Sequence, residues 1–310
     1  MEANSPGNFA HPASPGSEAA SRDFSTISPS AYSLLLMKGL TTIPYARQAA
    51  QLLIAPKPYE PTAVDRPPLF WARLMHFENR YWSIDQLMEQ LPITNILELS
   101  SGFSFRGLAL SRQQPVFYLD TDLPELIATK QQFVTALTRE DNGNAAAPPG
   151  HYELQPLNVL DESAFEALID RFPTGELLIL NEGLLVYLDL AEKETLCRTI
   201  KKVLQRRGGY WITADIYIQK DLDPTLIDRQ DAFSQFLQQH NIEEKKFPDF
   251  ETAAEFFTRM GFIVDREAKT DVTKLSTWPR LLATITPDIQ KKLFHTPKLQ
   301  ATWRLRIAAQ

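Results

Sequence analysis

The chain of 310 residues has a single cysteine, Cys197, no surplus of positive charge and no long apolar run. One cysteine excludes an internal disulfide, a Cys-based zinc cluster and an iron–sulfur centre, and it is typical of a protein of the reducing cytoplasm. The net charge of −6 provides no field that would hold a nucleic-acid backbone. The most apolar stretch, residues 177–190, contains Asn181 and Glu182 and is too short to cross a bilayer. We therefore expect a cytoplasmic protein that binds neither nucleic acid nor membrane, and we predict no metal.

The composition is otherwise that of a folded protein, with 44% hydrophobic and 23% charged residues. The first 30 residues differ, because 18 of them are Ala, Ser, Pro or Gly and cannot bury enough apolar surface to offset the entropy of ordering. They also lack the basic start and apolar run of a targeting signal. We predict that residues 1–25 form a disordered tail.

The remaining chain shows two kinds of pattern. Apolar residues at helical spacing over 28–53 and over 69–91 predict one helix in each segment, and together a helical N-terminal subdomain, residues 26–91. Short apolar runs then alternate with helical patterns, which is typical of βαβ units. Residues 92–310 are therefore predicted to be α/β, a doubly wound, Rossmann-like sheet of seven strands, with a polar helical insertion at about 217–248. The strands are predicted at 95–99, 116–119, 152–157, 177–180, 210–214, 262–265 and 302–307.

The first predicted strand ends in Glu98-Leu-Ser-Ser-Gly102, so small residues stand where the strand gives way to a helix. Ligands of doubly wound sheets bind at the carboxyl ends of strands, and small residues let a ligand approach the backbone. This loop is the first candidate for a binding site. The alternative is an ordinary corner that needs Gly102 for a positive φ.

The second strand ends in Tyr118-Leu-Asp-Thr-Asp122, which places an acid twenty residues after Gly102. This spacing is typical of a carboxylate that accepts hydrogen bonds from both hydroxyls of an adenosine ribose. The competing interpretation is that Asp120 or Asp122 caps the following helix, and both roles are compatible.

Two further strands end in polar residues. Asn158 follows the third strand, where a side-chain oxygen can meet the exocyclic amine of an adenine. Glu182 stands inside the apolar run after the fourth strand, and a buried charge there is costly unless it is paired or faces a ligand.

Together these segments resemble the class I S-adenosylmethionine-dependent methyltransferases, specifically the leucine carboxyl methyltransferase family, which includes polyketide O-methyltransferases. The resemblance covers about residues 69–214. It departs from the family at Ser100 and Ser101, where Gly-Ala is usual, and at Asn158, where Asp is usual. The matching segments are Glu98-Leu-Ser-Ser-Gly102, Tyr118-Leu-Asp-Thr-Asp-Leu-Pro124 followed by Lys130, Asn158-Val-Leu-Asp161 and Glu182-Gly-Leu-Leu-Val-Tyr187.

The resemblance implies S-adenosylmethionine as cofactor and S-adenosylhomocysteine as product. It implies that Arg73 holds the carboxylate of the methionine part, a task that suits the fork of a guanidinium, and that Tyr187 borders the acceptor pocket. Asp122 then binds the ribose. The full set of cofactor-binding residues that it implies is Lys38, Arg73, Glu98, Ser100, Gly102, Asp120, Asp122, Asn158, Val159 and Glu182.

The expected reaction is transfer of a methyl group to a carboxylate or hydroxyl of a small molecule or a protein. A carboxylate needs no base at pH 7, whereas a phenol benefits from one. His76, His151 and His240 lie outside the motifs, so no base is evident and a carboxylate or acidic hydroxyl is slightly favoured. One alternative is an NAD(P)-dependent oxidoreductase, although Ser100 and Phe105 replace two glycines of its Gly-x-Gly-x-x-Gly loop. The other is a non-catalytic protein that binds S-adenosylmethionine.

Overall fold

The computed structural model describes residues 28–59, 66–89, 91–141, 147–219, 235, 238–294 and 297–308. The predicted tail, residues 1–25, lies outside the described residues. Most of the predicted insertion at about 217–248 lies outside them as well. Near its end, the short 3₁₀-helix η4 (Glu243–Lys245) leads back to the sheet.

The described residues form one seven-stranded sheet with strands β1 (Asn95–Leu99), β2 (Phe117–Asp122), β3 (His151–Pro156), β4 (Leu177–Asn181), β5 (Gly209–Tyr217), β6 (Phe262–Glu267) and β7 (Gln300–Ile307). Each overlaps a strand predicted from the sequence. Their order is β3-β2-β1-β4-β5-β7-β6, with β1 to β5 parallel and β7 antiparallel to both neighbours. This is the methyltransferase arrangement, which confirms the predicted fold class. It differs from the six-stranded parallel order 3-2-1-4-5-6 of dinucleotide-binding domains.

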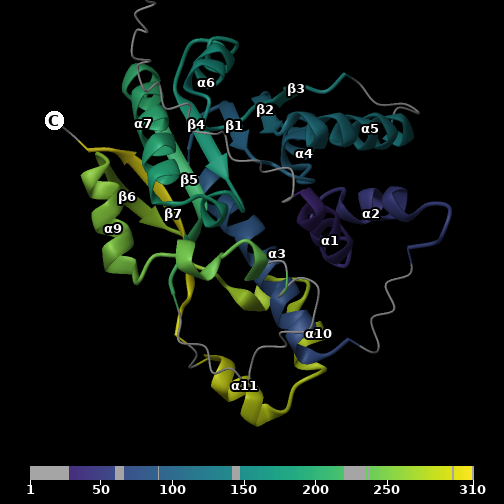
Figure 1. The fold of residues 1–310 in the computed structure, drawn as a ribbon. Helices are drawn as coiled ribbons and strands as arrows, with labels where there is room; N and C mark the ends of the chain where they lie inside the picture. Colours follow the sequence, from purple (N-terminus) through teal and green to yellow (C-terminus); the bar gives the residue numbers. More distant parts are fainter. Residues whose placement is uncertain are drawn as a thin grey trace, which may run out of the picture.

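Helices cover both faces of the sheet (Figure 1). On one face, α6 (Glu162–Ile169), α7 (Leu190–Arg207) and α9 (Phe250–Arg259) pack on a core that includes Leu97, Ile179 and Trp211. On the other, α3 (Pro68–Met88), α4 (Arg106–Gln113) and α5 (Pro124–Asp141) cover the sheet. Since side chains alternate between faces along a strand, Glu98 points to the α3 and α4 face.

The N-terminal part is helical, but its first helix is shorter than predicted. The pattern over 28–53 is split into α1 (Ser28–Lys38) and α2 (Ala46–Ile54), so a single helix there is wrong. Pro44 lacks the backbone N–H that a helix interior needs, and Tyr45 takes a left-handed φ of 60° directly before α2. This break separates α1, which ends at Lys38, from α2.

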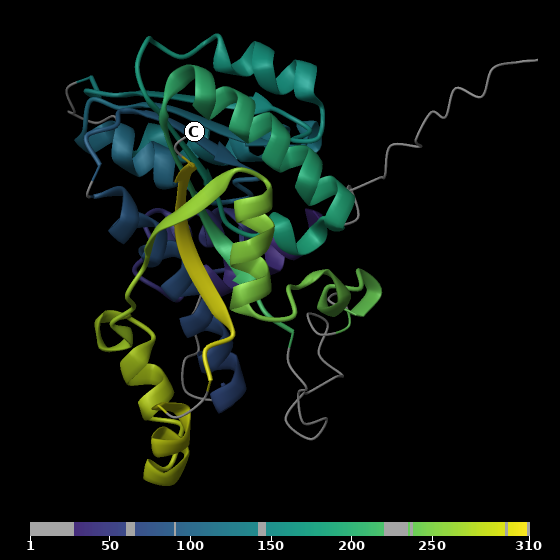
Figure 2. The same ribbon diagram turned by 90° about the vertical axis from the view of Figure 1, so that its left-hand side faces the viewer.

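The C-terminal part contains α10 (Trp278–Leu282) and α11 (Pro287–Phe294), which extend away from the sheet (Figure 2). Glu78 of α3 is fully buried and joins this part to α3. Its carboxylate accepts four hydrogen bonds, from the backbone N–H and hydroxyl of Ser276 and of Thr277. In the part of the chain that the structure describes, no helix is both long and apolar enough to cross a membrane.

Candidate functional site

The polar residues singled out in the sequence gather at one edge of the sheet. Because β1, β2 and β4 are parallel, the segments that follow them emerge at the same edge. In register, Glu98 of β1 lies between Asp120 of β2 and Leu180 of β4. The structure thus brings the glycine loop, the acids at the end of β2 and Glu182 into one region, beneath the N-terminal helices.

The loop after β1 has an unusual backbone that is tied to the end of β2. Ser100 and Gly102 have φ values of 50° and 51°, in the left-handed region. The N–H of Gly102 donates to Oδ2 of Asp122 over 2.8 Å, and the N–H of Leu123 donates to Oδ1 over 2.8 Å. Burial raises the pKa of Asp122, and these two N–H donors oppose that rise. A Cβ added at Gly102 would meet no atom within 4 Å, so the loop backbone borders open space.

Beneath this loop lies a buried ion pair. Lys130 of α5 places its Nζ 2.8 Å from Oδ2 of Asp120 and donates to Oγ of Ser101 over 2.9 Å. Tyr152 donates to the same Asp120 oxygen over 2.5 Å. Asp120 and Lys130 are fully buried, so this pair supports the loop from below. The sequence predicted Asp120 as a cofactor ligand, and the contacts found here are with the protein itself.

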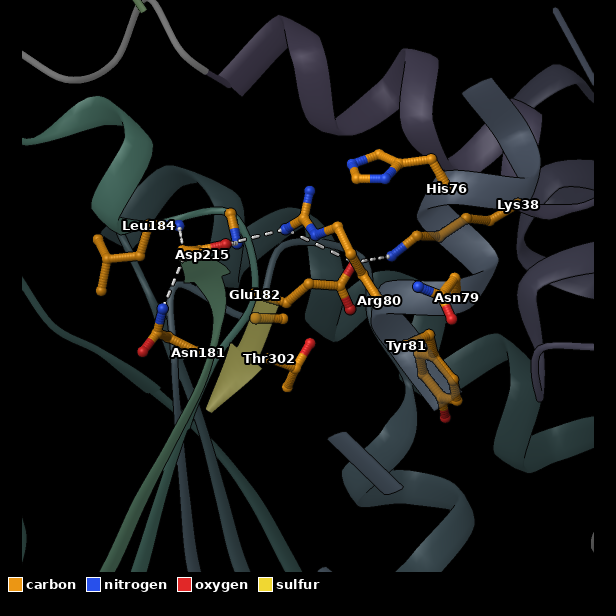
Figure 3. A network of polar contacts seen from close by, with 12 residues as sticks. Lys38, His76, Asn79, Arg80, Tyr81, Asn181, Glu182, Leu184, Asp215 and Thr302 are labelled. Atoms are coloured by element: carbon orange, nitrogen blue, oxygen red, sulfur yellow. Dashed lines mark hydrogen bonds and ion pairs between the residues drawn. The ribbon is translucent and has the colours of Figure 1, made fainter. Parts of the chain in front are cut away.

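Glu182 lies at the centre of a buried cluster of charges (Figure 3). Its Oε1 accepts a hydrogen bond from Nζ of Lys38 over 2.7 Å, and Arg80 of α3 lies 3.9 Å from the same oxygen. Arg106 of α4 lies 3.6 Å from Oε2. Burial would raise the pKa of Glu182, but the three cations together lower it to about 2. Glu182 is therefore ionised at neutral pH, and Lys38, one of the residues in the predicted cofactor-binding set, contacts it.

Asp215 of β5 completes the cluster and was not predicted. It is buried, and its carboxylate accepts hydrogen bonds from the backbone N–H groups of Gly183, Leu184 and Leu185 over 2.7, 2.6 and 3.1 Å. Arg80 donates to its Oδ1 over 3.2 Å. Asp215 thus fixes the segment that carries Glu182. The signal that could have found it is the one that marked Glu182, an acid at the end of an apolar strand.

Glu98 and Arg106 form the side of the cluster nearest the glycine loop. Tyr118 donates to Oε2 of Glu98 over 2.5 Å, and Nε of Arg106 lies 3.8 Å from Oε1. Burial raises the pKa of Glu98 to about 7. Arg106 also stacks on the ring of Tyr81 at 3.9 Å and pairs with Asp85. Sequence reasoning missed Arg106, although it stands directly after the loop.

Four buried polar atoms of the cluster have no hydrogen-bond partner among the described residues. They are Nε of Arg80, Nε and Nη2 of Arg106, and Oε2 of Glu182. Buried polar atoms are normally satisfied, because each unmade hydrogen bond costs about 1 to 3 kcal/mol. Nη2 of Arg106 and Oε2 of Glu182 face each other at 3.6 Å, beyond hydrogen-bond distance, so each keeps the capacity for one further hydrogen bond, of the kind that the carboxylate and the ammonium of an amino acid make.

The other predicted residues lie around this cluster. Arg73 is half-buried on α3, two turns before Arg80, and Arg80 is the α3 arginine that contacts Glu182 and Asp215. The side chain of Asn158 accepts a hydrogen bond from the N–H of Leu160 over 3.1 Å, and that of Val159 packs in the core. Tyr187 lies in the short helix η2 (Leu185–Tyr187), where its carbonyl accepts a hydrogen bond from Lys245.

Comparison with known proteins finds likeness in structure alone: no protein-family model matches the chain, and no curated protein matches its sequence. The chain is 12% identical to mitomycin 7-O-methyltransferase MmcR, covering 77% of this chain and 57% of that one, with a TM-score of 0.44. It is 14% identical to PigF in a structure with SAH, covering 80% and 64%, with a TM-score of 0.43. It is 11% identical to a DUF574 family protein from Streptomyces avermitilis, covering 89% and 97%, with a TM-score of 0.49. The chain spans less than two thirds of the first two proteins, and these values are too low to transfer an activity or a cofactor.

Proposed function

We propose that this protein is an S-adenosylmethionine-dependent O-methyltransferase that acts on a hydroxyl or carboxylate of a small molecule or a protein. The observation that carries the proposal is the edge of the sheet where an open, left-handed glycine loop, tied to Asp122, lies beside a buried cluster with unfilled donors and an unfilled acceptor. The strand order supports this choice over an NAD(P)-dependent oxidoreductase.

The described residues offer partners for each end of such a cofactor. Asp122 stands beside the open loop, where its remaining lone pairs suit the ribose hydroxyls. The amino-acid end fits the Glu182 cluster, with its carboxylate on Arg80 and Arg106 and its ammonium on Glu182. We assign the carboxylate to Arg80 rather than Arg73 because Arg80 lies in the cluster and has an open Nε. Asn158 and Val159 remain the proposed adenine contacts.

Bound S-adenosylmethionine would supply a methyl group on a sulfonium, which is already activated for transfer. The protein therefore contributes mainly by positioning, since holding the acceptor in line with the methyl group accounts for most of the acceleration in such a displacement. Lys38, Arg80 and Arg106 hold the cofactor end rigidly, because each is buried and paired. Tyr187, beyond Glu182, borders the space left for the acceptor in this proposal.

The proposal is tested by calorimetric titration of the purified protein with S-adenosylhomocysteine, NAD and NADP. We expect S-adenosylhomocysteine to bind with micromolar affinity and the two nicotinamide nucleotides not to bind. Binding of NAD or NADP alone would favour the oxidoreductase, and no binding by a folded protein would refute the cofactor assignment. Binding without turnover on any acceptor would favour the non-catalytic alternative.

Replacing Asp122 by alanine should weaken the binding of S-adenosylhomocysteine and of free adenosine by the same factor, about 10- to 100-fold, because both lose the ribose contact. Calorimetry measures both affinities. Asp170→Asn, at an exposed site beyond α6, is the control and should change neither. A loss confined to S-adenosylhomocysteine would mean that Asp122 does not bind the ribose.

Replacing Arg80 by lysine should weaken the binding of S-adenosylhomocysteine about tenfold and leave the affinity for adenosine unchanged, because lysine keeps the charge but loses the planar fork. The matched variant is Arg73→Lys, on the same helix, for which we expect a smaller change. If Arg73→Lys had the larger effect, the carboxylate would belong to Arg73, as the sequence resemblance implies.

A further inference from the structure

A histidine and a tyrosine meet directly beside the Glu182 cluster. Nε2 of His76, on α3, lies 2.6 Å from the hydroxyl of Tyr217, the last residue of β5. The two rings are 5.6 Å apart at 64°. His76 was set aside in the sequence because it lies outside every motif, and Tyr217 was not singled out.

This pair adjoins the proposed cofactor site. Arg80 follows His76 by one helical turn, and its guanidinium lies 5.6 Å from the centre of the Tyr217 ring while it also contacts Glu182 and Asp215. Figure 3 shows the His76 ring on the same side of α3 as Arg80. A group next to Arg80 but beyond the cofactor end is placed to meet the acceptor.

Both members of the pair are neutral at physiological pH. Burial and the charges of Arg80 and Lys246 lower the pKa of His76 to about 3, and Glu182 opposes this only in part. Burial, together with Asp215 and Glu182, raises the pKa of Tyr217 despite Arg80. An imidazolium or a phenolate standing alone would therefore be costly here, so a simple general base is disfavoured.

A neutral histidine and a neutral tyrosine have one N–H and one O–H between them. One of these protons makes the mutual hydrogen bond. With the proton on Nε2 of His76, the Tyr217 oxygen accepts it, Nδ1 keeps a lone pair that can take a proton, and the Tyr217 O–H proton is available to a third group. The pair can then take up a proton at Nδ1 and release one from Tyr217 without any change in net charge.

Resting on the proposed methyl transfer, we propose that His76 and Tyr217 form a neutral proton relay for a phenolic methyl acceptor. The oxygen of the acceptor forms a bond to the methyl carbon while the bond from that carbon to sulfur breaks. The electron pair of the broken bond stays on sulfur. The phenol proton passes to Nδ1 of His76, the Nε2 proton passes to the Tyr217 oxygen, and the Tyr217 hydroxyl proton passes to water. A carboxylate acceptor, already ionised, would have no use for this pair.

The first test compares two probes that differ in one group, 2-naphthol and 2-naphthoate, by calorimetry on protein saturated with S-adenosylhomocysteine. We expect 2-naphthol to bind at least about tenfold more tightly, and His76→Phe to remove this preference while the affinity for S-adenosylhomocysteine stays within about twofold. Tyr210→Phe, at the opposite end of β5, is the control and should change neither affinity. Equal binding of the two probes, or no binding of 2-naphthol, would overturn the relay.

The second test needs no acceptor. Nitrogen-15 NMR of the His76 ring should show a neutral imidazole protonated at Nε2 from pH 5 to 9, and Tyr217→Phe should redistribute the proton between the nitrogens, because Nε2 loses the oxygen that accepts its proton. Titration of His76 within that range, or an unchanged tautomer in Tyr217→Phe, would contradict the relay. Failure of S-adenosylhomocysteine to bind would instead refute the proposed function, whereas its binding with no response at His76 would refute only the relay.

Discussion

Asp215→Ala is expected to lower the free energy of unfolding by about 3 to 5 kcal/mol, the range typical of removing one member of a buried charge pair. The substitution leaves the Arg80 guanidinium without its 3.2 Å partner. It also leaves the N–H groups of Gly183, Leu184 and Leu185 without their acceptor. Urea unfolding at pH 7, followed by circular dichroism, measures the change as a shift of the midpoint.

Asp215→Asn is the matched variant, because it keeps one acceptor oxygen in nearly the same volume. We expect it to cost roughly half as much as Asp215→Ala, since some of the backbone donors remain satisfied. A cost below about 1 kcal/mol for the alanine variant would show that water replaces the carboxylate and that the segment after β4 is not fixed by Asp215.

Glu182→Gln is expected to lower the free energy of unfolding by about 3 kcal/mol at pH 7, because the pKa of Glu182 in the folded protein is about 2 against an ordinary value of 4.5. A lowered pKa means that the ionised form stabilises the fold. This contribution is complete above the ordinary value and is lost as the pH falls from 4.5 to about 2. The difference between the wild-type protein and Glu182→Gln should therefore shrink over that interval.

Urea unfolding of both proteins at pH 7, 5 and 3 follows this difference. The control is Glu162→Gln, which removes an exposed carboxylate paired with Lys202 and should change stability by less than about 1 kcal/mol. A difference for Glu182→Gln that is the same at pH 7 and pH 3 would argue against ionisation of Glu182 as the source of its stability.

Most of the strands could be predicted from the sequence because they contain short apolar runs, and β7 could be predicted because its apolar residues alternate with polar ones. The side chains of residues 95–99 point alternately to the two faces of the sheet, and all of them are buried. The apolar residues of this segment were therefore enough to predict β1. The first helix was harder, because its apolar spacing continues past Gly39 while Pro44 and the left-handed Tyr45 interrupt it. The interruption depends on a backbone conformation, which apolar spacing does not record.

The site could be predicted where a motif is local and not where it is assembled from distant segments. Gly102 and Asp122 were found because they are twenty residues apart and follow adjacent strands. Arg80, Arg106 and Asp215 come from separate elements, and their meeting depends on how α3 and α4 pack on the sheet. Arg73 was selected by family resemblance, but it lies two turns before Arg80 on nearly the same side of α3, so position along the helix decides which arginine reaches Glu182.

The anchoring of α3 on two sides has a consequence for how fast a ligand can associate. Glu78 ties the helix to Ser276 and Thr277, and two residues later Arg80 ties it to Asp215, so the helix can neither roll nor slide without breaking buried polar contacts. The Glu182 cluster is therefore already in place before any ligand arrives. Ligand association at this cluster should show a single kinetic phase, with a rate proportional to ligand concentration and no slow step for helix rearrangement.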